Sequence, residues 1–129
     1  MSKTTLEILT EARDMAMDPN NLTTGRLVRE NSDGSRCYCP LGLIALAAGF
    51  QACYDERESL VFDGIGDDYN ELYSMESVHL LGAAIKEMTP ELFKHRELVL
   101  GDYVYLFNDL NSTKHTDIVA AFNKAIELY

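Results

Sequence analysis

Apolar residues recur every three or four positions in three stretches of the chain, which is the spacing of one buried helix face. The first stretch begins after Thr4 and stops at Asp18-Pro19, which cannot continue a helix. Helices are therefore predicted over about residues 5–17, over about residues 75–88 and from about residue 114 to the C-terminus.

Proline and glycine mark the limits of further elements. Pro40 suits the first turn of a helix, and the apolar face that follows it ends at Gly49. Thr89-Pro90-Glu91 predicts the start of another, shorter helix. Residues 103–107 are rich in strand formers, and we expect them to be either a short buried strand or a helical turn.

The pattern changes between residues 25 and 38, where short apolar pairs flank Asn31-Ser32-Asp33-Gly34. These four residues favour the positive φ of a tight turn, which predicts a β hairpin. Residues 60–62 are expected to be a packing point without assigned secondary structure. The predicted fold is mainly α, a compact single-domain helical bundle over residues 1–129 with a minor β hairpin (α+β).

Length and composition agree with one soluble domain: 129 residues, of which 47% are hydrophobic and 25% charged. The most hydrophobic stretch, residues 41–50, has about half the length that a membrane-spanning helix needs. The three cysteines are an odd number and no secretory signal leads the sequence, so we expect a reducing environment, the cytoplasm of a bacterial host cell.

The charge is strongly negative and unevenly distributed. Lys and Arg number 11 against 21 Asp and Glu, a net charge of −10, which disfavours direct binding to nucleic acids and to anionic membranes. Residues 55–76, called the acidic segment below, hold eight acids and one base and so account for −7 of this charge. The segment is either a solvated surface or a docking surface for a basic partner protein, with Asp63, Asp67, Asp68 and Glu71 as candidate binding residues. The spacing of its acids does not fit a calcium-binding EF-hand loop.

Cys39 is the first candidate for chemistry. It precedes an apolar helix, and the positive end of a helix dipole favours a thiolate. The alternatives are a small core residue, or a metal site shared with Cys37, for which a single Cys-x-Cys pair is weak evidence. We therefore predict no metal ion and no cofactor.

A second cluster precedes the C-terminal helix and contains Asn108, Asp109 and His115. Asn and Asp at such a position usually fix a loop by hydrogen bonds to its backbone. His115 in the first turn of a helix is expected to be neutral and could act as a base for a Cys39 nucleophile, with Asn108 or Asp109 orienting the imidazole. His79 and His95 lack ligand spacing and are expected to have packing or surface roles.

Together these clusters resemble a family of small uncharacterised proteins from bacteria and their phages, catalogued as a domain of unknown function. The resemblance rests on Gly25-Arg26-Leu27-Val28-Arg29, Ser32-Asp33-Gly34, Tyr38-Cys39-Pro40-Leu41-Gly42, Phe107-Asn108-Asp109 and His115. It implies a shared small fold and a bacterial or phage setting, and it assigns no reaction. The chain departs from the family pattern at Leu22 and Tyr38, where members usually carry tryptophan.

Three functions are compatible with these features. The first is a non-enzymatic binding protein that acts through the acidic segment, for example a phage-encoded modulator or inhibitor of a host or defence protein. The second is a thiol hydrolase or transferase that uses Cys39 and His115 with Asn108 or Asp109. The third is a small-ligand binding protein with a pocket for a small cationic or nucleoside-like ligand, formed by Tyr38, Asp109 and His115. The oligomeric state is left open.

Overall fold

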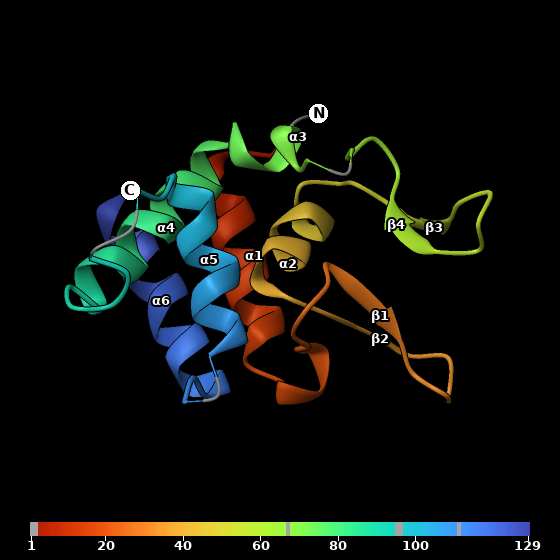
Figure 1. The fold of residues 1–129 in the computed structure, drawn as a ribbon, viewed down its shortest axis with the longest axis horizontal. Coiled ribbons are helices and arrows are strands. Elements are labelled where there is room, and N and C mark those ends of the chain that lie inside the picture. Colours follow the sequence, from red (N-terminus) through yellow and green to blue (C-terminus); the bar gives the residue numbers. More distant parts are fainter. Residues whose placement is uncertain (1–2, 67, 95–96, 111) are drawn as a thin grey trace.

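The computed structural model describes residues 3–66, 68–94, 97–110 and 112–129, and the described residues are mainly helical with two small hairpins (Figure 1). The elements are α1 (Thr5–Ala16), η1 (Pro19–Asn21), β1 (Val28–Glu30), β2 (Arg36–Tyr38), α2 (Pro40–Ala47), β3 (Ala52–Tyr54), β4 (Leu60–Phe62), α3 (Asn70–Tyr73), α4 (Glu76–Met88), α5 (Leu100–Asp109) and α6 (His115–Leu128). The predicted fold class, mainly helical with a minor β component, is confirmed.

Local capping explains where the first helices begin. At α1 the Glu7 N–H donates to the Thr4 hydroxyl oxygen at 3.1 Å, and the Thr4 N–H donates to the Glu7 carboxylate at 3.0 Å. At α2, Pro40 occupies the first turn, where its missing N–H costs no hydrogen bond. Both starts lie where the sequence predicts them.

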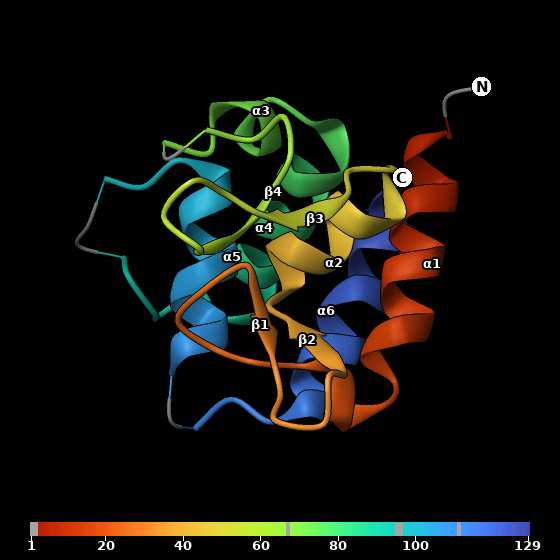
Figure 2. The same cartoon turned by 90° about the vertical axis from the view of Figure 1, so that its right-hand side faces the viewer.

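The helices pack against one another around one apolar core. Helix α4 packs against α5 and α6, α1 packs against α2 and α6, and α2 also contacts α5 (Figures 1 and 2). Leu9, Leu41, Leu81 and Phe122 from four of these helices are at most 1% exposed. The amphipathic spacing along the sequence is therefore satisfied by helix-on-helix burial.

Both hairpins turn in the same way. In the β1–β2 hairpin the Asn31 N–H donates to the Ser35 carbonyl at 2.7 Å, and Gly34 has a φ of +88°. In the β3–β4 hairpin the Asp55 N–H donates to the Ser59 carbonyl at 2.9 Å, and Glu58 has a φ of +61°. Strands β1 and β4 contact each other, so the hairpins lie side by side next to the helices (Figure 2).

One expectation from the sequence needs correction. Residues 90–94 form turns instead of a short helix, and Phe93 adopts a φ of +61°, which a helix does not allow. Residues 60–62, to which the sequence pattern assigns no secondary structure, form strand β4, paired with residues 52–54. The alternatives for residues 103–107 are resolved in favour of helix α5.

In the part of the chain that the structure describes, no helix is long and apolar enough to cross a membrane.

Candidate functional site

The cluster around Cys39 and the cluster around Asn108 and Asp109 both form hydrogen bonds to one loop, residues 23–27, which leads into β1. At the end of α5, the Asn108 side-chain amide donates to the Thr23 carbonyl at 2.8 Å, and the Gly25 N–H donates to the Asp109 carboxylate at 3.0 Å. At the start of α2, the Cys39 N–H donates to the Leu27 carbonyl at 3.2 Å. The loop is therefore held between the last turn of α5 and the first turn of α2.

Glycine at position 42 lets α2 approach this loop closely. A Cβ atom on Gly42 would overlap the carbonyl group of Leu27, so no larger residue fits without a backbone shift. The Gly42 N–H also donates to the Cys39 sulfur at 3.5 Å, which makes Cys39 the cap of α2. The Cys-Pro-Leu-Gly sequence thus has a structural role: it caps the helix, starts it and allows the close contact.

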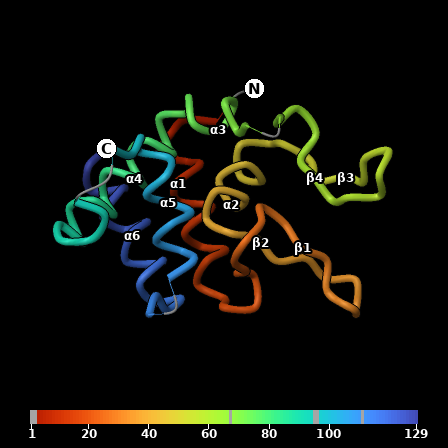
Figure 3. Tube along the Cα trace, viewed as in Figure 1, coloured from red at the N-terminus to blue at the C-terminus, as the bar shows by residue number. Residues whose placement is uncertain are grey.

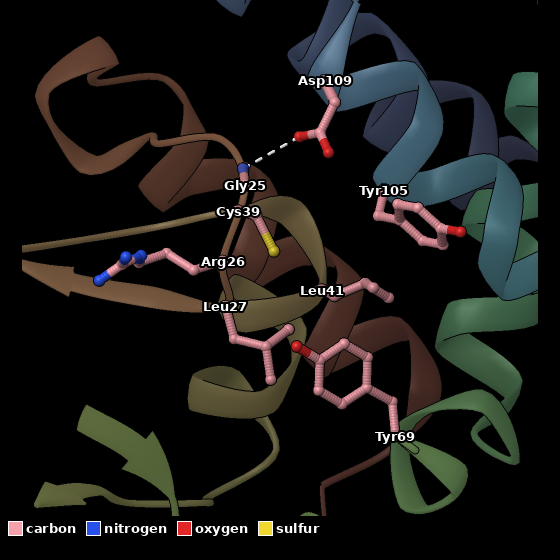
Figure 4. Close-up of a pocket in the computed structure, with 8 residues that line it drawn as sticks. All are labelled: Gly25, Arg26, Leu27, Cys39, Leu41, Tyr69, Tyr105 and Asp109. Carbon is pink, nitrogen blue, oxygen red and sulfur yellow. Dashed lines mark hydrogen bonds between the residues drawn. The ribbon is translucent and has the colours of Figure 1, made fainter. Parts of the chain in front are cut away.

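A pocket of about 260 Å³ opens between the loop, α2 and α5. Its walls are loop residues 25–27, Cys39, Leu41, Tyr69, Tyr105 and Asp109. Figure 4 shows the Cys39 sulfur and the Asp109 carboxylate on two sides of this hollow, with the Tyr69 and Tyr105 side chains on the others. This pocket brings a thiol, a carboxylate and two tyrosine side chains together around one cavity.

The thiol in this pocket is protonated at neutral pH. Burial, which disfavours the charged form, raises the pKa of Cys39 to about 11. Hydrogen bonds from the backbone of Gly42 and Leu41 oppose this effect, and the negative charge of Asp109 adds to it. The helix dipole and these N–H donors therefore do not produce the thiolate that the sequence argument allowed for.

The other predicted catalytic residues are distributed differently. Asp109 lines the pocket with Cys39, whereas Asn108 is 5% exposed and is used to hold Thr23. His115 is exposed at the first position of α6, and it is not among the described residues that line this pocket. The pairing of Cys39 with His115 stays a prediction.

Tyr38 is not among the residues that line this pocket; it is the last residue of β2 and pairs with Val28 of β1. Its half-buried ring contacts Phe62 of β4, with ring centroids 6.1 Å apart, and so links the two hairpins. Burial raises the pKa of the Tyr38 hydroxyl above its ordinary value. Its contacts indicate a packing role between the hairpins.

Some carboxylates of the acidic segment accept hydrogen bonds from nearby backbone N–H groups. The Glu71 carboxylate accepts from the Gly66 N–H at 2.7 Å, and the Asp68 carboxylate accepts from the Asn70 N–H at 3.2 Å. Asp63 is exposed, and no hydrogen bond to its side chain is found in the described residues. Asp67, also predicted to bind, lies outside the described residues, as does His95.

The sequence does not place three parts of the pocket at a site. Residues 25–27 enter only through the family resemblance, because they carry no chemical signature, and neither Tyr69 nor Tyr105 is singled out. The sequence does not distinguish Tyr105 from Tyr103 in the same run, although the structure buries Tyr103 and leaves Tyr105 37% exposed. Over the described residues, no group of three or more His, Cys, Asp or Glu side chains could hold a metal ion.

Comparison with known proteins identifies the family to which the chain belongs. The chain matches the family described as "Family of unknown function (DUF6197)" over residues 1–128. No curated protein and no solved structure matches it. Both motif clusters, the pocket and the acidic segment fall inside the matched residues, and the resemblance to an uncharacterised domain family is confirmed. The chain belongs to this family of unknown function, DUF6197.

Proposed function

We propose that this protein is a non-enzymatic binding protein whose acidic segment captures a basic surface of a partner protein. The proposal rests on one observation about charge. The four ion pairs found among the described residues are Lys3–Glu11, Arg13–Asp14, Arg36–Glu30 and Lys94–Glu91, and none of them includes a residue of the acidic segment. The carboxylates of this segment thus have no basic partner within the described chain.

The segment also lies where a partner can reach it. It runs from the β3–β4 hairpin through α3 to the start of α4, and these elements lie along the upper part of the molecule in Figures 1 and 3. Glu56, Glu58, Asp63 and Glu76 are all exposed. Since Asp68 and Glu71 are engaged with backbone N–H groups, Glu56, Glu58 and Asp63 are the better choice for testing charge alone.

The clustered carboxylates of the acidic segment act on a basic partner before the two proteins touch. Unpaired carboxylates on one side of a protein attract a basic partner and increase its association rate, and salt weakens both effects. A nucleic-acid-binding protein of a host or a defence system has a basic surface of this kind. By covering that surface, the acidic segment would compete with nucleic acid for the same partner.

The thiol-enzyme alternative has less support. A nucleophilic cysteine needs a substantial thiolate fraction, and burial keeps the pKa of Cys39 at about 11. The thiol also accepts a hydrogen bond from the Gly42 N–H as the cap of α2. Both features suit a structural role for Cys39.

The test is affinity capture from a bacterial lysate at low and high salt with three forms of the protein. The first is the unmodified chain. The second carries Glu56→Gln, Glu58→Gln and Asp63→Asn, which removes three charges from the acidic segment with little change in shape. The third carries Glu87→Gln, Glu97→Gln and Glu127→Gln, exposed acids outside the segment, and so has the same net charge as the second.

We expect the unmodified chain and the third form to capture the same protein at low salt and to release it at high salt. The second form should lose most of this capture. If all three forms capture equally, or if high salt has no effect, the acidic segment is not the docking surface.

A further inference from the structure

The pocket beside Cys39 and Asp109 combines one charged group with apolar and aromatic walls. One Asp109 carboxylate oxygen accepts from Gly25, and in Figure 4 the other oxygen points into the hollow between Cys39 and Tyr105. In the described part of the chain, Asp109 forms no ion pair and no other hydrogen bond. A ligand that enters the pocket therefore meets an unneutralised negative charge on one side.

The remaining walls suit an aliphatic chain. Leu41 is fully buried and Leu27 is 9% exposed, and both contribute side chains to the pocket. The Tyr69 and Tyr105 rings extend these apolar walls on the other sides, and tyrosine rings also attract cations. Because its pKa is about 11, the Cys39 thiol is a neutral, polarisable part of the wall at neutral pH.

An anion does not fit this pocket, although it lies at a helix N-terminus. The N–H groups that could bind an anion are engaged or missing: Cys39 donates to Leu27, Pro40 has no N–H, and Gly42 donates to the Cys39 sulfur. The negative charge of Asp109 and the net charge of −10 add repulsion.

Arg26 does not neutralise Asp109. It lines the pocket, but in Figure 4 its guanidinium group points away from Asp109, toward the hairpin. Among the described residues no ion pair joins Arg26 to any acid. Arg26 also lines a second hollow, together with Tyr54 and Glu58 of the neighbouring hairpin.

We infer that this pocket binds one organic cation, a guanidinium or primary ammonium group on an aliphatic chain. Asp109 pairs with the charged head, and Leu27, Leu41 and the two tyrosines pack against the chain. A free alkylamine and the arginine or lysine side chain of a partner protein share this chemistry. The inference does not depend on the acidic segment, because it is carried by the pocket alone.

The experiment titrates defined probes into the protein at about 150 mM salt and follows the amide resonance of Gly25 by NMR. The Gly25 N–H is bound to the Asp109 carboxylate, so its chemical shift reports what that carboxylate contacts. The probes are agmatine, the peptide acetyl-Gly-Arg-Gly-amide, and the same peptide with citrulline, which has the shape of arginine without its charge. The Gly34 amide, in the turn of the β1–β2 hairpin, serves as the reference signal.

Two single substitutions test the site. Asp109→Asn removes the charge and retains an oxygen that accepts from Gly25, so the loop should keep its place. Asp63→Asn removes one charge from an exposed position in the acidic segment and is the matched control. A further pair of variants tests the aromatic ring of Tyr105: Tyr105→Leu removes the ring, and Tyr105→Phe keeps it. Tyr105 is exposed, so we expect both variants to fold.

We expect agmatine, the arginine peptide or both to shift the Gly25 signal of the unmodified protein and of Asp63→Asn, and citrulline to have no effect. Affinity should fall about threefold to tenfold in Asp109→Asn, the size expected for one exposed charge-assisted hydrogen bond. It should also fall in Tyr105→Leu more than in Tyr105→Phe. Agmatine alone would identify a free amine as the ligand, and the peptide alone would identify a side chain.

Two outcomes would overturn the inference. One is that neither cation shifts the Gly25 signal. The other is equal binding to the unmodified protein, to Asp63→Asn and to Asp109→Asn, which would mean that the cations bind to diffuse negative charge. Neither outcome concerns capture by the acidic segment, whose test uses other substitutions.

Discussion

At the scale of single residues, the two hairpin turns differ in one decisive side chain. Each turn needs a residue with positive φ at its fourth position, which glycine adopts freely and other residues adopt at a cost of about 1–2 kcal/mol. The first turn has Gly34 there, and the second has Glu58. The β3–β4 turn therefore contains strain that the β1–β2 turn lacks.

Replacing Glu58 with glycine should stabilise the protein. We expect Glu58→Gly to raise the free energy of unfolding by about 0.5–1 kcal/mol, since the relief of strain exceeds the added entropy of a glycine in the unfolded chain. Gly34→Ala should lower it by about 1 kcal/mol for the converse reason. Denaturant unfolding of both variants measures this, and a loss of stability in Glu58→Gly would show that the Glu58 side chain makes a contact worth more than the strain.

Because the Cys39 thiol is buried, the free energy of unfolding should change with pH in the alkaline range. Its pKa rises from an ordinary 9.0 to about 11 in the folded state, so the folded protein holds this proton more tightly than the unfolded chain does. The resulting stability is fully present below about pH 9 and is lost as the pH rises toward about 11. Between about pH 8 and about pH 10.5 the loss should be about 2 kcal/mol.

Cys39→Ala isolates this effect from the ionisation of tyrosines and lysines. The variant lacks the thiol, so its unfolding free energy should fall less over the same pH interval, and the difference between the two curves gives the contribution of Cys39. Parallel curves for the two proteins would mean that the thiol ionises in the folded state as easily as in the unfolded chain.

At the scale of elements, α2 and the loop at residues 23–27 depend on the absence of a side chain at Gly42. We expect Gly42→Ala to cost more than about 2 kcal/mol of unfolding free energy, because the added methyl group meets the Leu27 carbonyl, which is backbone and cannot rotate away. Gly66→Ala is the matched control, since a Cβ at position 66 makes only ordinary contacts, and it should change stability by less than about 0.5 kcal/mol. Thermal or denaturant unfolding compares the two, and equal effects would exclude the close approach of α2 to the loop.

The elements that the sequence predicts correctly are those with local signals. Helix α1 has its capping box, α2 has Pro40, and the first hairpin has Gly34 in its turn. The second hairpin was missed because Glu58 stands where glycine would mark the turn. Residues 103–107 have strand propensity, yet α4 buries one face of this segment, and that packing decides for a helix.

The candidate site was predictable only in part, for the same reason. The sequence singles out Cys39 and Asp109 and joins them only in a hypothetical catalytic group with His115. Their meeting depends on the loop at residues 23–27, which joins the end of α5 to the start of α2 through contacts between residues more than ten positions apart. No local pattern encodes such contacts, so neither Tyr69 nor Tyr105 could be placed beside them.

At the scale of the whole molecule, the charge of −10 is a cost to folding as well as a means of binding. Folding confines this charge to a compact molecule, and none of the described acids of residues 55–76 forms an ion pair. Their repulsion should therefore weaken the folded state at low salt. Dissolved salt screens it, since the Debye length falls from about 30 Å at 0.01 M to about 10 Å at 0.1 M.

We expect the free energy of unfolding to increase by about 1 kcal/mol or more between about 0.01 M and about 0.5 M sodium chloride. The four ion pairs found outside the segment among the described residues are exposed or partly exposed and lose little on screening, so they cannot reverse this trend. The variant with Glu56→Gln, Glu58→Gln and Asp63→Asn should be more stable than the unmodified chain at low salt and should gain less from added salt. Denaturant unfolding at the two salt concentrations measures both effects, and an equal gain in the two proteins would show that these carboxylates are too far apart to repel one another, which would also weaken the case for a concentrated docking surface.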